Sequence, residues 1–157
     1  MRVSIRLGGV TLLLVFLGVF GLSGSASAGG VDVGIRGGFY TDVDKPFLGA
    51  ELLFGVTHRI YFNPNVEYVF VENGNYLTVN ADFHYDLIPE GPTYFWLGGG
   101  LGLARIDPEG DDNSNSDLVG NFIAGVGFKA GGSVPYIQGK IIVKDDTAAS
   151  IAVGIRF

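Results

Sequence analysis

The last ten residues of the chain, Ala148 to Phe157, alternate strictly between two kinds of side chain. One face is made of β-branched and aromatic residues and ends on Phe157, whereas the other holds small residues and Arg156. A period of two over this length predicts a β-strand with two different environments. Such an apolar face packs on a core in a soluble sandwich, or contacts lipid in an outer-membrane barrel.

The same alternation recurs along the chain, and no helical period is found after residue 28. Turn-forming clusters separate eight segments of about ten residues, a length that spans about 25 Å when strands tilt by about 40°. The predicted strands are 31–40, 47–56, a third that follows the turn at 57–59 and ends near Val71, 76–87, 93–106, 118–130, a seventh that includes Ile137 to Val143, and 148–157. Bulges are expected near Pro64, which has no N–H, and near Gly98 to Gly102, where the strand phase could shift by one residue.

Residues 1–28 have the three parts of a cleaved secretory signal peptide. Arg2 and Arg6 precede an apolar run of about 13 residues, too short for the roughly 20 that span a bilayer, and Ala26 to Ala28 form a small-residue cleavage site. We therefore predict one mature domain, residues 29–157. Cleavage changes the net charge from −6 to −8, which argues against a nucleic-acid partner.

The acidic residues gather in every second connection between the predicted strands. In outer-membrane barrels short turns are periplasmic and longer loops extracellular, so we expect this acidic end to face outward and to meet an extracellular partner or divalent cations. The loop from Pro108 to Asp117 lacks the EF-hand pattern, so no specific calcium site is predicted. These connections hold Asp42, Asp44, Glu72, Asp107, Glu109, Asp111, Asp112, Asp117, Asp145 and Asp146.

The polar faces of the strands carry charges of both signs. An eight-stranded barrel has an interior only wide enough for side chains, and charges inside it must pair to offset desolvation. We therefore predict a structural interior ion network, with Arg156 paired to carboxylates such as Asp32; a narrow pore is the alternative. The network is Asp32, Arg36, Glu51, Glu67, Asp82, His84, Asp86, Lys129, Lys140 and Arg156, with Arg105 left unassigned.

Asp82, His84 and Asp86 share one face of a predicted strand and are the best candidates for a metal or acid–base site. Such a site needs further ligands from other strands, and the second histidine, His58, lies in a turn. Gly98 to Gly102 resemble a phosphate loop only in glycine content, because no helix follows. The chain has no cysteine, so thiolate chemistry is excluded. We predict no catalytic, metal or cofactor site.

The whole predicted mature chain resembles the small outer-membrane β-barrel proteins of the OmpA transmembrane-domain and OmpX type, most specifically in its ending, Ile151 to Phe157. The resemblance implies an all-β, eight-stranded antiparallel up-and-down transmembrane barrel in the outer membrane of a Gram-negative-type bacterium. It also implies that Phe157 is part of a signal read by the barrel-assembly machinery. The lipid A deacylases of the family use a Ser beside a His, whereas Phe83 and Tyr85 flank His84 here. The OmpA peptidoglycan-binding domain is absent from this sequence.

The favoured function is a non-enzymatic outer-membrane barrel with a plugged polar interior, surrounded by lipid, in a structural or surface-interaction role. A membrane-embedded lipid-modifying enzyme and a soluble lipocalin-like periplasmic binder are the alternatives. The soluble binder needs a polar outer face, yet large apolar residues recur on one face of most predicted strands.

Overall fold

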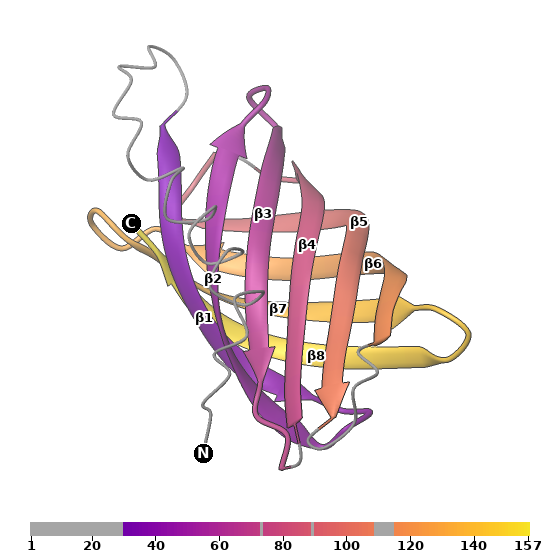
Figure 1. The fold of residues 1–157 in the computed structure, drawn as a ribbon. Helices are drawn as coiled ribbons and strands as arrows, with labels where there is room; N and C mark the ends of the chain where they lie inside the picture. Colours follow the sequence, from indigo (N-terminus) through magenta and orange to yellow (C-terminus); the bar gives the residue numbers. More distant parts are fainter. Residues whose placement is uncertain (1–29, 73, 89, 109–114) are drawn as a thin grey trace.

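Eight antiparallel strands form a single closed barrel, in which each strand pairs with its neighbours in the sequence (Figure 1). The computed structural model describes residues 30–72, 74–88, 90–108 and 115–157. The predicted signal peptide lies outside these residues, as do Glu109, Asp111 and Asp112. The strands are β1 (Val31–Tyr40), β2 (Lys45–Gly55), β3 (Ile60–Val69), β4 (Gly74–Asp86), β5 (Thr93–Pro108), β6 (Asn115–Phe128), β7 (Val134–Val143) and β8 (Thr147–Arg156).

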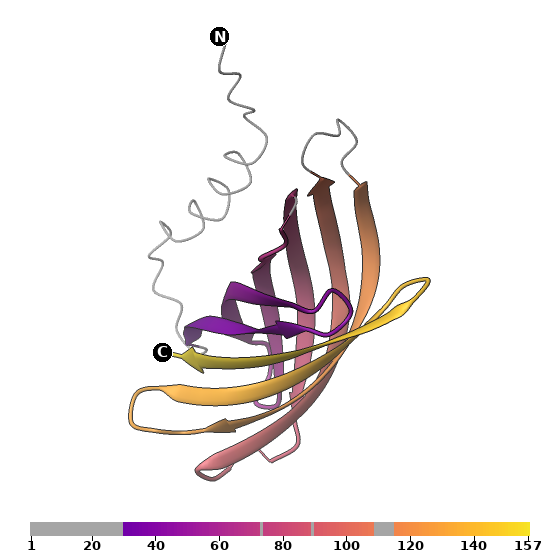
Figure 2. The same cartoon turned by 90° about the horizontal axis from the view of Figure 1, so that it is seen from below.

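The first and last strands close the barrel. β1 and β8 pair antiparallel from Gly34 opposite Arg156 to Tyr40 opposite Ser150, and Figure 2 shows the two strands side by side. Closure removes the open edges that would otherwise leave backbone groups unpaired. The predicted fold, an eight-stranded antiparallel up-and-down barrel, is confirmed.

The glycine-rich part of β5 contains no bulge, so this expectation was wrong. The pairing of β4 with β5 runs without a shift from Gly74 opposite Pro108 to Asp86 opposite Trp96. Glycine is needed here because the two backbones approach closely. A Cβ added to Gly98 would lie 2.0 Å from the Phe83 carbonyl oxygen, and one on Gly100 would lie 2.1 Å from that of Ala81.

Pro64 also causes no bulge, because β2 and β3 keep the same register on both sides of it. Phe70 N donates to Pro46 O at 2.9 Å and Val56 N to Ile60 O at 2.8 Å. Since hydrogen-bonded pairs alternate along an antiparallel ladder, Leu52 and Pro64 occupy such a pair. The proline has no N–H to donate, and the Asn63 side chain replaces it with a 2.7 Å hydrogen bond from Nδ2 to the Leu52 carbonyl.

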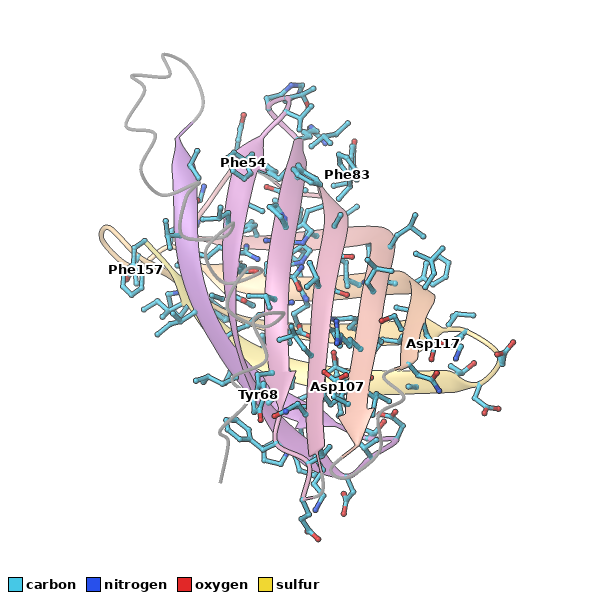
Figure 3. All side chains as sticks on the ribbon, in the orientation of Figure 1. Phe54, Tyr68, Phe83, Asp107, Asp117 and Phe157 are labelled. Carbon is cyan, nitrogen blue, oxygen red and sulfur yellow. The ribbon has the colours of Figure 1, made fainter. Side chains whose placement is uncertain are left out.

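The outer wall is an apolar belt with different chemistry at its two ends (Figure 3). Phe54, Phe83 and Phe157 lie toward the end that carries the short turns, whereas Asp107 and Asp117 lie toward the other end. Large apolar side chains of all eight strands are exposed on this wall, among them Ile35, Leu48, Tyr68, Leu101, Phe122, Ile137 and Val153. Among the described residues, no helix is long and apolar enough to cross a membrane.

Candidate functional site

The interior of the barrel receives most of the predicted ion network. Eight of its members are buried: Arg36, Glu51, Glu67, Asp82, His84, Asp86, Lys140 and Arg156. Asp32 is only half-buried. The interior placement of Lys129 was wrong, because Lys129 follows the end of β6 and is exposed, with its amine 5.9 Å from the centre of the Tyr94 ring. Arg105 faces outward, where its Nε donates to Asp107 at 3.1 Å.

An apolar layer fills the interior at the end that carries the acidic loops. Tyr40 and Phe47 meet edge to face, with ring centroids 5.2 Å apart, and Tyr76 lies 6.0 Å from Tyr40. Val69 and Val119 are buried against them. These residues occupy inward-facing positions near the strand ends. The strand pairing places them at the same height in the barrel.

Ion pairs occupy the middle of the interior and connect five strands. Arg36 of β1 contacts Glu51 of β2, with Nη1 3.4 Å from Oε2, and also pairs with Glu67 of β3. Lys140 of β7 donates to both carboxylate oxygens of Glu67 at 2.9 Å. Arg156 of β8 donates from Nε to Glu51 at 2.7 Å, so its partner is Glu51 and not the predicted Asp32. Each carboxylate therefore has two cationic neighbours, which offsets the desolvation of the buried charges.

Amide side chains form the second part of this middle layer, and the sequence analysis did not assign them a role. Asp82 accepts hydrogen bonds from Asn65 at 3.0 Å and from Asn121 at 2.9 Å. Asn80 connects the two amides, donating to Asn65 at 2.9 Å and accepting from Asn121 at 2.9 Å. The alternating positions of these asparagines on inward faces were the available signal. They satisfy Asp82 without a cation.

Aromatic rings fill the interior at the end that carries the short turns. His84 stacks on Trp96 with ring centroids 5.6 Å apart, and Trp96 Nε1 donates to Gln138 at 3.2 Å. The Arg156 guanidinium lies 4.3 Å from the Tyr136 ring and 5.0 Å from that of Trp96. These contacts are cation–π and stacking interactions. Through Arg156, they connect the ion pairs to the aromatic layer at the short-turn end of the interior.

The side chains proposed as a candidate metal or acid–base site, Asp82, His84 and Asp86, are surrounded by groups that support a structural role. All three side chains are buried on the inward face of β4, but Asp82 is held by amides and His84 by an indole ring. No group of three histidine, cysteine, aspartate or glutamate side chains among the described residues could hold a metal ion. Within the described residues, the buried His84 Nε2 has no hydrogen-bond partner.

Among the described residues, the acidic end carries three surface salt bridges, one of them the Arg105–Asp107 pair. Lys45 Nζ lies 2.5 Å from Glu72, and this hydrogen bond lowers the pKa of the Glu72 carboxyl. Lys144 Nζ lies 2.6 Å from Asp117 and joins the β7–β8 turn to the start of β6. Exposed pairs contribute little to stability. Asp42, Asp44, Asp145 and Asp146 add further negative charge around them.

No protein-family model and no curated protein sequence matches the chain. Several solved structures do match the fold of the chain. Neisserial surface protein A superposes with a TM-score of 0.65 at 13% identity, over 83% of this chain and 98% of that one. The outer-membrane enzyme PagL gives 0.54 at 15%, over 80% and 98%. Ail, the attachment invasion locus protein of Yersinia pestis, in complex with the heparin analogue sucrose octasulfate, gives 0.55 at 15%, over 82% and 97%. The chain therefore has the fold of the small eight-stranded outer-membrane β-barrels, and the resemblance expected from its alternating strands is confirmed at the level of that fold.

Proposed function

We propose that this chain is a non-enzymatic β-barrel of a Gram-negative-type outer membrane, exported by a cleaved signal peptide and closed internally by its own side chains. The observation that carries the proposal is the contrast between its two faces. Exposed apolar residues cover the outer wall, while charged residues are enclosed and paired. This is the reverse of a water-exposed barrel and matches a wall that faces lipid. It also disfavours a soluble lipocalin-like binder.

The closed interior is the part of the proposal that argues against a pore. The support for it is an aromatic and apolar layer at one end, paired charges in the middle and stacked rings at the other end. Conductance measurements on the purified protein in planar bilayers test this directly. We expect no stable single-channel current, and a reproducible current would support the narrow-pore alternative.

A surface role follows from the acidic rim, which would lie outside the cell. Ail binds sucrose octasulfate, a polyanion, whereas the rim here carries excess negative charge that repels such a ligand. A cationic surface partner or divalent cations suit this rim better. Phe157 would contact the assembly machinery when the barrel inserts.

An enzymatic role is the second candidate because PagL shares the fold. The best residues for it are Asp82, His84 and Asp86, which we place in the structural interior. Their replacement by alanine should leave the lipid composition of the envelope unchanged in thin-layer chromatography and mass spectrometry. A change in that composition with the barrel still folded would favour the enzyme.

Site-directed labelling in intact cells tests the location and orientation. The chain has no cysteine, so Asp145→Cys at the acidic end and Gly132→Cys in the β6–β7 turn each introduce one thiol. A membrane-impermeant maleimide should label Asp145→Cys in intact cells and Gly132→Cys only after permeabilisation. Heat-dependent gel mobility of both variants confirms folding. Recovery of the protein in the soluble periplasmic fraction would overturn the proposal.

A further inference from the structure

The described part of the outer wall has a hollow of about 310 Å³ across β1, β2 and β8, and a larger one across β5 to β8. The larger hollow has a volume of about 510 Å³ and is lined by Leu97, Phe122, Ala124, Gly139, Ile141 and Ala149, together with inward-facing neighbours. We propose that this hollow binds one acyl chain of a membrane lipid. The inference rests on the proposed outer-membrane function, because that function places this wall in hydrocarbon.

Small outward residues on adjacent strands create the hollow. The ladder aligns Leu97 of β5 with Ala124 of β6, and Ala124 with Gly139 of β7. A Cβ added to Gly139 would meet no atom within 4 Å, so the position opens onto free space. Next to them Phe122 and Ile141 are opposite each other and stand out from the wall, with exposed fractions of 64% and 49%. The floor of the hollow is therefore made of small residues, and large side chains form its rim.

The chemistry of the lining selects an acyl chain. Lys140 and Ser150 contribute to the floor, but both are buried and the Lys140 amine is engaged with Glu67 inside the barrel. The outward side chains of the lining offer no hydrogen-bond partners, and a water molecule needs two to four of them to be held. A chain of methylene groups needs none, and the volume lies in the range of small-molecule pockets.

The position of the hollow agrees with this occupant. Gly139 lies in the middle of β7 and Ala124 is opposite it on β6, away from both rims, at the depth where a bilayer contains only acyl chains. A second copy of the chain would have to bury about 800 Å² per partner in a stable interface, far more than the hollow itself provides. A dimer formed through this wall is the competing explanation for the hollow, and the test below distinguishes it from lipid binding.

Native mass spectrometry of the whole barrel, refolded in dimyristoyl phosphatidylcholine vesicles and released in mild detergent, tests the proposal. The wild type should retain one lipid. Gly139→Leu, which fills the floor, should lower the lipid-bound fraction about tenfold, the effect of losing apolar contact equal to about two methylene groups. Gly139→Ala should give an intermediate loss. Ala81→Leu is the matched control because Ala81 is also exposed on the outer wall, on β4, and it should retain the lipid.

The outcomes separate this inference from the proposed function. Heat-dependent gel mobility first shows which variants are folded and inserted, and Ala124→Leu replaces Gly139→Leu if the latter fails to fold. A wild type that inserts but carries no lipid, or equal lipid on the filled variant and the control, overturns the acyl-chain site alone. A dimer that is lost on filling assigns the hollow to a second copy. A wild type that does not insert overturns the proposed function itself.

Discussion

Arg156 reaches across β1 to Glu51, with 2.7 Å between its Nε and the carboxylate Oε1. Both residues are paired with the same residue of β1, Gly34, from opposite sides. The ion pair thus spans the strand at which the first and last parts of the chain meet. It connects β8 directly to β2 and stabilises the closure of the barrel.

Removing one member of this pair should be strongly destabilising. Glu51→Leu leaves the Arg156 guanidinium, which is 1% exposed, without its anion, and breaking a buried pair costs about 3–5 kcal/mol. The measurement is the free energy of unfolding from urea titration of the barrel in vesicles. The double variant Glu51→Leu/Arg156→Met removes both charges and should recover most of the loss, since Arg36 keeps Glu67 and Asn65 as partners. A single variant that costs under about 1 kcal/mol would contradict this account.

Adding even one methyl group at Gly34 should lower the free energy of unfolding. A Cβ at this position would lie 2.8 Å from Glu51 Oε1 and 2.9 Å from Glu51 Cγ, so Gly34→Ala pushes the carboxylate away from Arg156. We expect a loss of about 1–3 kcal/mol, typical of overpacking, in the same urea titration. Gly120→Ala is the control, because the only atom near its Cβ would be the Val143 carbonyl oxygen at 3.8 Å, an ordinary contact. In a Glu51→Ala background Gly34→Ala should cost much less, and an unchanged cost there would argue against this mechanism.

The partner of Arg156 shows where sequence reasoning ends. Alternation identifies the face of a strand on which a residue lies, and it placed Arg156 and Glu51 inside. It does not give the level at which two strands meet, and Asp32 was named because it lies on the first strand, which was expected to pair with the last. The register of β8 on β1 and of β1 on β2 sets that level. Such pairing depends on contacts between residues far apart in the sequence.

The two expected bulges show a different limit. β1 was predicted as residues 31–40 and has those bounds, because alternation and turn residues define a regular strand well. At Pro64 and at Gly98 to Gly102 local chemistry predicted an irregularity, and neighbouring strands removed it. Asn63 supplies the missing donor at Pro64, while the glycines permit a close approach to β4. The ladder on both sides then keeps its register.

The Asn63 side chain should therefore contribute more to the free energy of unfolding than an ordinary buried amide. Asn63→Ala leaves the Leu52 carbonyl unpaired and also removes a 3.1 Å hydrogen bond to Glu51, so we expect a loss of about 1–3 kcal/mol. Pro64→Val restores a backbone N–H opposite Leu52. In that background Asn63→Ala should cost less, as measured by urea titration. Asn75→Ala, at an exposed position, is the control and should stay within about 0.5 kcal/mol. Equal costs of Asn63→Ala in the two backgrounds would show that the amide does not replace the proline.

Phe157 combines a seam contact with the proposed assembly signal, and two variants can separate these roles. Its N–H donates to Val33 O at 2.9 Å and its carbonyl accepts from Val33 N at 3.3 Å, while its ring is exposed. Deleting Phe157 removes the ring and both hydrogen bonds, whereas Phe157→Ala removes the ring alone. If the ring is read during assembly, both variants should accumulate less folded barrel in cells, measured as heat-modifiable protein in the outer-membrane fraction. Both should still refold in vesicles without the machinery, because the ring buries little surface. Normal insertion of the deletion variant in cells would refute the assembly role, and loss with the deletion alone would assign the effect to the two hydrogen bonds at the seam.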